Sequence, residues 1–382
     1  MAKLLSLLTV SAFAVSDPQW QDFKAKFSKS YTSPAEENRR YSVFKSNLAS
    51  IAAHNKDPSK TYKRGINHFS DFTQADLQAD RLMSLPYPEE DIEMECPLRF
   101  KAPENIKMPS SLDWRDPENN PKNLNAVTQV KDQGSCGSCY IFSATGAMEG
   151  SLCLNGFFNC TTFEGLSEQQ PLDCGSWMKR DYDNWTEYPQ WYEFYGCSGG
   201  WPGNVMQYAY WNRGISCLGK YPYRSGTEKF DNLMNQDECY YDPSMSHGYP
   251  NRNICGTTSK DGPDAIAMAE AIYFKGPVSI SMYVGGTFSS YTSGVYVPAE
   301  DDCPNLEKTG INHCMLAVGW GEEMVNGEMM PYWIIKNSWG PEWGDNGFFK
   351  VIRGVNACGV EGNIQYADMI GVHDDEPGSG EE

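Results

Sequence analysis

The sequence predicts an α+β fold in which helices come first along the chain and short strands come later. Residues 17–83 carry apolar side chains at helical spacing. Four runs rich in β-branched and aromatic residues lie after residue 276. No internal repeat breaks this order. Helices and strands that are segregated in this way are typical of α+β folds.

The composition is that of an acidic, cysteine-rich globular protein. The 382 residues allow two or three domains. A net charge of −19, from 31 basic and 50 acidic side chains, excludes a generally basic nucleic-acid binder and disfavours docking on anionic membranes. An aromatic content of 13% excludes a disordered chain. Thirteen cysteines predict disulfides, and their odd number leaves at least one thiol unpaired within the chain.

Residues 1–16 have the pattern of a secretory signal peptide. A lysine precedes an apolar run over 4–10, and alanines then supply the small residues of a cleavage site. The segment is too short to span a bilayer, and no later stretch is apolar over about 18 residues. Asn159 and Asn184 each begin a glycosylation sequon. We therefore expect a glycoprotein of the secretory pathway, delivered to a lysosome or exported.

Two helices are predicted near the N-terminus. The first is expected to begin at Asp17 and to present Trp20, Phe23 and Phe27 on one face. A capping box at residues 33–36 opens the second. Positions three or four residues apart form one stripe along it. The stripe consists of Glu36, Arg40, Phe44, Asn47, Ile51 and Asn55.

A composition change divides the chain. Residues 84–107 hold four prolines and an acidic patch, which predict an exposed linker. We therefore expect a signal peptide (1–16), a helical unit with its linker (17–107), a main domain (108–372) and an acidic, disordered tail (373–382).

The main domain is expected to begin with helices and to end in strands. Its helices are predicted over residues 139–152 and 263–275. The inward face of the first is expected to consist of Ile141, Phe142, Thr145, Met148 and Leu152. The strands are predicted over residues 277–284, 313–320, 332–336 and 347–352.

Candidate chemistry concentrates around Cys139. A thiol at a helix N-terminus is favoured as thiolate by the helix dipole, and a neighbouring imidazolium would favour it more strongly. Of the main-domain histidines, His247 lies in a loop-like run and His373 in the acidic tail, whereas His313 opens an apolar strand that could hold its ring rigidly. Asn337 closes another strand, and its amide could fix the imidazole tautomer.

Two sets of motifs resemble a known family. Residues 133–140, 312–314 and 336–340 are similar to the active-site blocks of papain-like cysteine proteases. The N-terminal helical stripe and a following motif resemble the inhibitory propeptide of the cathepsin L-like branch. The resemblance implies a papain-like two-lobed fold: a helical lobe, an antiparallel barrel-like lobe and a cleft between them. The second propeptide-like motif consists of Gly65, Asn67, Phe69 and Asp71.

The resemblance also implies roles for individual residues. Cys139 resembles the nucleophile that forms a thioester, His313 the general acid and base, and Asn337 the residue that orients the imidazole. Gln133 resembles the side-chain donor of the oxyanion hole, and Trp339 the indole that shields the His313 contact from water. The residues implied to bind substrate, with an apolar preference at P2, are Gly199, Gly200, Trp201, Pro202, Ile311 and Asn363, together with Trp339.

The cysteines can be matched to the same family. The resemblance implies the bridges Cys136–Cys197, Cys174–Cys239 and Cys303–Cys358, with Cys217 as an alternative partner in place of Cys239. Two further bridges are open to the remaining residues, and spacing does not settle their connectivity. These candidates are Cys153–Cys160 and Cys217–Cys255, which leave Cys96 and Cys314 over.

One segment departs from the family. Residues 175–196 form an aromatic-rich insertion between two cysteines. It is either a surface loop packed on its own aromatics or an exosite near Gly199. The insertion lacks the paired histidines of the cathepsin B occluding loop, so the sequence does not indicate carboxydipeptidase activity.

The expected function is a secreted or lysosomal cysteine endopeptidase made as an inactive proenzyme. It should act as a monomer on protein or peptide substrates. No metal or cofactor is expected, and neither nucleic acid nor a membrane is an expected partner. Its propeptide should block the cleft until acid weakens it, with Asp71 as a candidate sensor. Two alternatives stay open: a thiol–disulfide oxidoreductase using Cys136 and Cys139, and a catalytically inactive homologue.

Overall fold

The computed structural model describes most of the main domain and the N-terminal helices. The residues described are 16–83, 102–103, 106–181, 195–212, 214–225, 239, 251–257, 264–299, 302–303 and 310–369. The expected signal peptide (apart from its last residue), the Asn184 sequon, the acidic tail and most of the linker and insertion lie outside them. No helix within the described part is both long and apolar enough to cross a membrane.

Two N-terminal helices pack through aromatic side chains. Helix α1 (Pro18–Lys26) is capped by the Asp17 carboxylate and helix α2 (Pro34–Lys56) by the Ser33 hydroxyl. The predicted capping box on Ser33 is only half correct, because the Glu36 carboxylate instead accepts the main-chain N–H of Thr32 at 2.9 Å. The small core between these helices consists of Trp20, Phe23 and Phe44.

The predicted stripe on α2 contacts the segment that follows the helix. Asn47 donates to the carbonyls of Ser70 and Phe72, each at 3.0 Å. Asn55 brackets Arg64 by donating to its carbonyl at 2.7 Å and accepting its N–H at 2.9 Å. The stripe therefore fixes the path of the chain into strand β1 (Tyr62–Arg64) and helix α3 (Gln74–Arg81).

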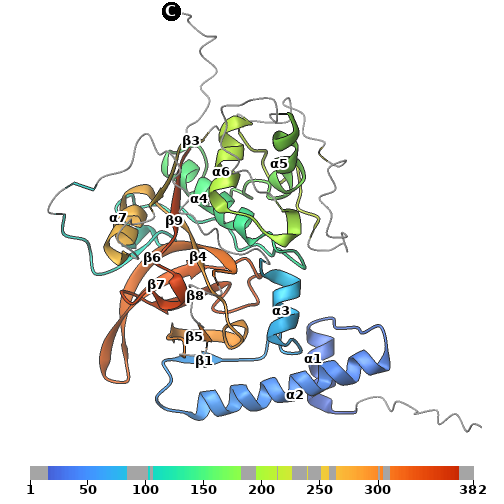
Figure 1. Ribbon diagram of the computed structural model, residues 1–382. Coiled ribbons are helices and arrows are strands. Elements are labelled where there is room, and N and C mark those ends of the chain that lie inside the picture. Colours follow the sequence, from blue (N-terminus) through green and yellow to red (C-terminus); the bar gives the residue numbers. More distant parts are fainter. Residues whose placement is uncertain are drawn as a thin grey trace, which may run out of the picture.

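Three helices of the main domain, α4 (Cys139–Leu154), α5 (Gln169–Asp181) and α6 (Pro202–Trp211), gather in one lobe (Figure 1). Helix α4 contacts both α6 and the sheet. Every α4 residue as far as Cys153 is buried, so the expectation of a single inward face is wrong. An apolar helix can be buried on all sides when other elements surround it. Helix α5 extends into the segment predicted to be an insertion loop.

The other lobe is a mostly antiparallel sheet with the order β1-β5-β8-β7-β6-β4-β9-β3. Strand β2 (Leu112–Asp113) pairs with β6 off this path, and β5 pairs with β8 in parallel. Helix α7 (Ala265–Lys275) matches the helix predicted over 263–275. The predicted strands correspond to β4 (Val278–Met282), β6 (His313–Val325), β7 (Glu328–Lys336) and β8 (Phe348–Ile352). The strands not predicted include β3 (Asn251–Thr257), β5 (Tyr291–Tyr296) and β9 (Ile364–Met369).

Each disulfide in the described part of the chain joins two segments of the same lobe. The structure contains all three bridges implied by the resemblance and a further bridge, Cys153–Cys160. The predicted Cys217–Cys255 bridge is wrong, because Cys217 is a free thiol whose main chain pairs with Leu166 in the helical lobe. Cys255 lies on β3, opposite Tyr366 of β9. Spacing alone could not separate these locations. Cys96 lies outside the described residues.

Candidate active site

Three elements from distant parts of the sequence meet at Cys139. Cys139 is the first residue of α4, His313 the first residue of β6, and Asn337 directly follows β7. All three side chains are buried. Ser138, at the N-cap of α4, makes no side-chain capping bond, so the positive end of the helix dipole is presented to the thiol without a side-chain oxygen between them.

The imidazole of His313 is held in one orientation. Its Nε2 lies 2.8 Å from the amide oxygen of Asn337. The indole of Trp339 covers this contact, with ring centroids 4.9 Å apart. The other ring nitrogen, Nδ1, is buried without a geometric hydrogen bond to any described group. It is therefore available to exchange a proton with the neighbouring Cys139 sulfur.

The surroundings of Cys139 favour the thiolate. Burial raises the pKa of Cys139, but a hydrogen bond from the Cys314 thiol and the charge of His313 outweigh it. The main-chain N–H of Cys314 also donates to the Cys139 sulfur at 3.4 Å. Together these contacts hold the pKa of Cys139 well below the usual value for a thiol.

Gln133 is fixed beside this site by the loop that follows Asn337. Its side-chain oxygen accepts from the Ser338 hydroxyl at 2.6 Å, and its main-chain N–H donates to the Ser338 carbonyl at 2.9 Å. Its amide nitrogen is thereby aimed at the turn before α4, where it donates to the carbonyl of Cys136 at 2.8 Å. A rigid N–H donor beside a nucleophile is the arrangement of an oxyanion hole.

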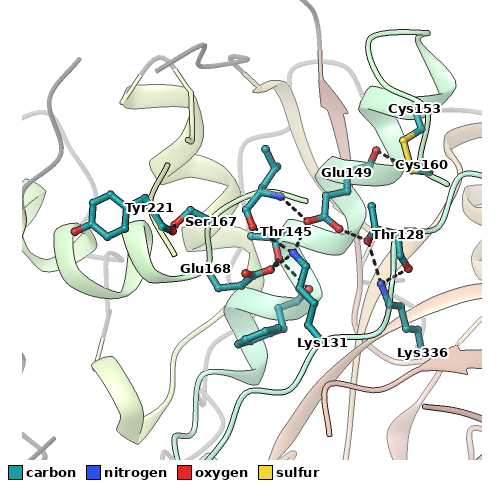
Figure 2. Close-up of polar contacts among 12 residues, drawn as sticks. Thr128, Lys131, Thr145, Glu149, Cys153, Cys160, Ser167, Glu168, Tyr221 and Lys336 are labelled. Atoms are coloured by element: carbon teal, nitrogen blue, oxygen red, sulfur yellow. Dashed lines mark hydrogen bonds and ion pairs between the residues drawn. A yellow bond between two sulfur atoms is a disulfide. The ribbon is translucent and has the colours of Figure 1, made fainter. Parts of the chain in front are cut away.

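A largely buried group of four charged side chains lies at the end of β7 (Figure 2). We call Lys131, Glu149, Glu168 and Lys336 the ionic cluster. Lys131 bridges the carboxylates of Glu149 and Glu168 at 2.7 and 2.5 Å. Lys336 donates to the main-chain and hydroxyl oxygens of Thr128 at 2.9 and 3.1 Å, and that hydroxyl donates to Glu149 at 2.5 Å. The cluster thus ties helix α4 to the end of β7.

The charges of the ionic cluster depend on one another. Burial lowers the pKa of Lys131, but the two carboxylates outweigh it and raise that pKa. Lys131 and Lys336 in turn outweigh burial at Glu149 and lower its pKa, whereas burial dominates at Glu168 and raises its pKa. Burial lowers the pKa of Lys336 to about 8. Sequence reasoning missed this cluster, although Glu149 in an otherwise apolar helix was a signal that could have found it.

Comparisons with known proteins assign the family. The model of the papain family cysteine protease matches residues 108–368, and the model of the cathepsin propeptide inhibitor domain matches residues 20–77. The chain belongs to the papain family of cysteine proteases. Its fold is papain-like, and it is made as a proenzyme with its own inhibitory propeptide.

Relatives of this protease match it over most of their length. Pro-cathepsin H of Bos taurus is 35% identical over 341 residues, which are 89% of this chain and 87% of the relative. Cathepsin L1 of Drosophila melanogaster is 33% identical over an alignment of 386 positions that covers 95% of this chain and 89% of the relative. The solved structure of digestive procathepsin L2 from Tenebrio molitor larval midgut superimposes with a TM-score of 0.72 at 31% identity, covering 91% of this chain and 98% of that chain.

The propeptide of this protease docks on the sheet lobe. Strand β1 pairs antiparallel with β5 of the main domain, which extends the sheet (Figure 1). Phe69 packs edge-on against Trp339, with ring centroids 5.1 Å apart. Asn67 donates to the carbonyl of Ser289 at 2.7 Å. Two residues of the propeptide-like motif thus make the contacts that hold the propeptide next to the Cys139 site.

The propeptide segment at the end of helix α3 reaches the site itself. The carbonyl of Arg81 accepts from the Gln133 side chain at 2.8 Å, on the same nitrogen that is aimed at the turn before α4. Two residues later, the N–H of Met83 donates to the carbonyl of Asn312 at 2.9 Å. Leu82 and Met83 are both buried. In this proenzyme the propeptide therefore takes up the side-chain N–H of Gln133, which the papain-family resemblance assigns to the oxyanion hole.

Asp71 sits inside the propeptide rather than at the docking surface. Its side chain is 2% exposed, its carboxylate is bridged by Lys29 at 3.0 Å, and it accepts from the Tyr31 hydroxyl at 3.1 Å. These contacts join the first loop of the propeptide to the segment after β1. Its role as an acid sensor stays a prediction.

The predicted substrate-binding residues lie near α6 and the start of β6. Apart from Asn363, which is half-buried, they are buried in the proenzyme. Gly200 packs against Tyr140, where an added Cβ would come within 2.5 Å of the ring. Gly199 has a φ of +127°. Packing and backbone conformation thus require both glycines, in addition to the predicted approach of substrate. The roles predicted for Trp201, Pro202 and Ile311 stay predictions.

The structure removes the dithiol needed by an oxidoreductase. Cys136 is bonded to Cys197, so it is not available as the partner of Cys139 in a C-x-x-C redox centre. Cys139 itself is a free thiol. The alternative of a thiol–disulfide oxidoreductase that uses Cys136 and Cys139 is therefore wrong for the protein in this bonded state.

Proposed function

We propose that this protease is a cysteine endopeptidase that cleaves peptide bonds through a thioester on Cys139. The observation that carries the proposal is a buried thiol with a lowered pKa next to an imidazole whose far nitrogen is fixed by Asn337. A thiolate paired with a fixed imidazole supplies both the nucleophile and the proton donor that acyl transfer needs.

The Cys139 thiolate attacks the carbonyl carbon of the scissile bond. The side-chain N–H of Gln133 and the main-chain N–H of Cys139 donate to the oxyanion that forms. His313 then donates its proton to the leaving amine, and the thioester remains on Cys139. Next, His313 takes a proton from water, whose oxygen attacks the thioester and releases the acid. Asn337 keeps the imidazole in one tautomer throughout, and Trp339 excludes water from that contact.

The propeptide contacts support inhibition in the same chain. The Arg81 carbonyl accepts from the Gln133 side chain, the Met83 N–H donates to the main-chain carbonyl of Asn312, and Phe69 packs against Trp339. We place the propeptide at residues 17–107 and the mature domain at 108–372. Removal of the propeptide would free the Gln133 donor and open the apolar Trp201 and Ile311 side chains to a medium or large apolar P2 residue.

Two observations support delivery through the secretory pathway. The Asn159 sequon is exposed, and it lies in the small loop closed by Cys153–Cys160. Four disulfides occur in the described part of the chain, which is typical of oxidising compartments. We place the mature enzyme in a lysosome or outside the cell, acting as a monomer on protein or peptide substrates.

Labelling of the acid-activated enzyme tests the mechanism. The thiolate predicts that one equivalent of iodoacetamide modifies Cys139 and abolishes peptidase activity, and that Cys139→Ala is inactive. The matched control is Cys217→Ala, which removes a half-buried free thiol whose pKa is raised by burial, and which should stay active. Activity that survives in Cys139→Ala would reject the mechanism.

A further inference from the structure

A second buried free thiol touches the proposed nucleophile. Cys314 directly follows His313 on β6 and is completely buried. Its thiol is in hydrogen-bonding contact with the Cys139 sulfur, and its main-chain N–H donates to the same sulfur at 3.4 Å. On its other side, the Cys314 sulfur lies 3.3 Å from the hydroxyl of Ser281. Apart from its hydrogen bond to the Cys139 sulfur, this thiol has no role in the mechanism above.

The main chain of Cys314 lies close to the Cys139 sulfur. With its nitrogen 3.4 Å from the Cys139 sulfur, Cys314 has its Cα within about 5 Å of that sulfur. Disulfides join Cα atoms about 4.4–6.8 Å apart, with both sulfurs between them. Cys314 therefore lies where a rotation of its side chain could carry its sulfur toward that of Cys139.

The two thiols differ in reactivity. The contacts around Cys139 hold its pKa well below the usual value, whereas burial and then the neighbouring Cys139 thiolate raise the pKa of Cys314. Cys139 is therefore the sulfur that reacts with an oxidant, and Cys314 is a protonated thiol within reach of the product. A low-pKa cysteine beside a second thiol is the arrangement of reversible thiol oxidation.

We propose that Cys314 is a resolving thiol that traps oxidised Cys139 as a reversible Cys139–Cys314 disulfide, and that this bond is an inactive storage state of the mature enzyme. This inference rests on the proposed function, because it takes Cys139 as the nucleophile. The oxidant is a peroxide, and the reductant that restores the enzyme is a low-molecular-weight thiol or dithiol.

The reaction proceeds in two steps. The Cys139 thiolate attacks one oxygen of hydrogen peroxide, the O–O bond breaks, and the released hydroxide takes a proton to leave as water; Cys139 becomes a sulfenic acid. The Cys314 sulfur then attacks the Cys139 sulfur, the S–O bond breaks, and the hydroxyl leaves with the Cys314 proton as a second water. Peroxide has accepted two electrons, one from each thiol. A dithiol reduces the Cys139–Cys314 disulfide by thiol–disulfide exchange and is itself oxidised to a disulfide.

The disulfide would protect the nucleophile from irreversible loss. Without a resolving thiol, a sulfenic acid reacts with more peroxide to give sulfinic and then sulfonic acid, which thiols do not reduce. With Cys314 in contact, closure of the disulfide competes with that second oxidation. The enzyme should therefore lose activity in peroxide but recover it on reduction.

The test uses acid-activated mature enzyme, hydrogen peroxide and dithiothreitol. The enzyme is treated with excess peroxide, peroxide is removed with catalase, and peptidase activity is measured before and after dithiothreitol. We expect about a tenfold loss in the wild type and nearly full recovery. Digestion without reduction should yield a cross-linked peptide pair that contains Cys139 and Cys314.

Three variants give the comparison. Cys314→Ala and Cys314→Ser, each normalised to its own untreated activity, should lose activity in peroxide and regain less than about a fifth of it, with two or three oxygens added to Cys139. Cys217→Ala removes a free thiol elsewhere and should recover as the wild type does. If neither Cys314 variant folds, the cross-linked peptide from wild type decides alone.

The outcomes separate this inference from the proposed function. Wild-type enzyme that is active but forms no Cys139–Cys314 peptide, or Cys314 variants that recover fully after prolonged peroxide, would overturn the resolving role and leave the protease mechanism intact. Retained activity in Cys139→Ala would overturn the mechanism, and the inference with it.

Discussion

Two buried polar clusters lie next to each other between the lobes, and they differ in how their groups are compensated. In the ionic cluster, Lys131 is held by two carboxylates within 2.7 Å. In the site around Cys139, the side-chain nitrogens of Asn337 and Trp339 are buried without a hydrogen-bond partner among the described residues. Buried polar groups are normally paired, and exceptions need an explanation. Unpaired buried atoms also occur elsewhere, including one carboxylate oxygen of Glu168 in the ionic cluster. The comparison therefore teaches that the two clusters differ in charge compensation: opposite charges stabilise the ionic cluster, whereas the site around Cys139 keeps a reactive thiol next to an imidazole.

The largest effect is expected from a substitution that breaks the ionic cluster. Glu149→Ala leaves the ammonium of Lys131 buried with one carboxylate and removes the acceptor of Thr128, so the free energy of unfolding should fall by about 3–5 kcal/mol. Urea unfolding of the proenzyme in the inactive Cys139→Ala background measures it. The matched control is Glu164→Gln, an exposed glutamate in the next loop, which should change stability by less than about 0.5 kcal/mol. Equal losses in both variants would mean that the ionic cluster is not structural.

The next effect separates chemistry from structure. Gln133→Ala removes the side-chain donor of the proposed oxyanion hole, so kcat should fall about 10²–10³-fold with a smaller change in KM. Steady-state kinetics of the activated enzyme measure it, and thermal unfolding checks that the fold survives. A variant whose KM rises while kcat is kept would instead assign Gln133 to substrate binding alone.

A third prediction concerns acid release of the propeptide, through His68. Burial first, and then the charge of Arg81, lowers the pKa of His68 to about 3; Asp132 opposes this and Lys29 adds to it. The undocked propeptide, with an ordinary histidine pKa near 6.5, therefore binds more protons between about pH 6.5 and 3. Docking should be fully stable above pH 6.5 and weaken by up to about tenfold per pH unit below it.

The His68→Gln variant checks this dependence. In the Cys139→Ala proenzyme, the fall of the melting temperature between pH 6.5 and 4 should be shallower for His68→Gln than for its parent. Near pH 8 the histidine is neutral in both the docked and the undocked propeptide. There the substitution should leave the pH dependence of the melting temperature unchanged. Parallel curves at acid pH would exclude His68 as a sensor and leave carboxylates such as Asp71 to account for activation.

Sequence reasoning found the groups that do chemistry but not the groups that support them. Cys139, His313 and Asn337 could be proposed because each ends or begins an element and because their motifs resemble a family. Glu149 offered a signal as a lone charge in an apolar helix, but its partners could not be proposed, since Lys336 joins the cluster only through the packing of β7 against segments far away in sequence. Spacing likewise misplaced Cys217, because a half-buried thiol and a bridged one have the same local sequence signals. Complete burial of α4 depended on elements that the sequence pattern did not show, such as α6 and β9.

The most direct test of the account is the pH dependence of alkylation at Cys139. Mature enzyme is mixed with iodoacetamide across a pH series, and the rate is followed by loss of activity and by mass. The account predicts rapid labelling of Cys139 well below pH 8.5, the usual pKa of a cysteine, and a shift of the profile toward that value in His313→Ala. A wild-type profile centred near pH 8.5, or one unchanged by His313→Ala, would contradict a thiolate stabilised by the imidazole.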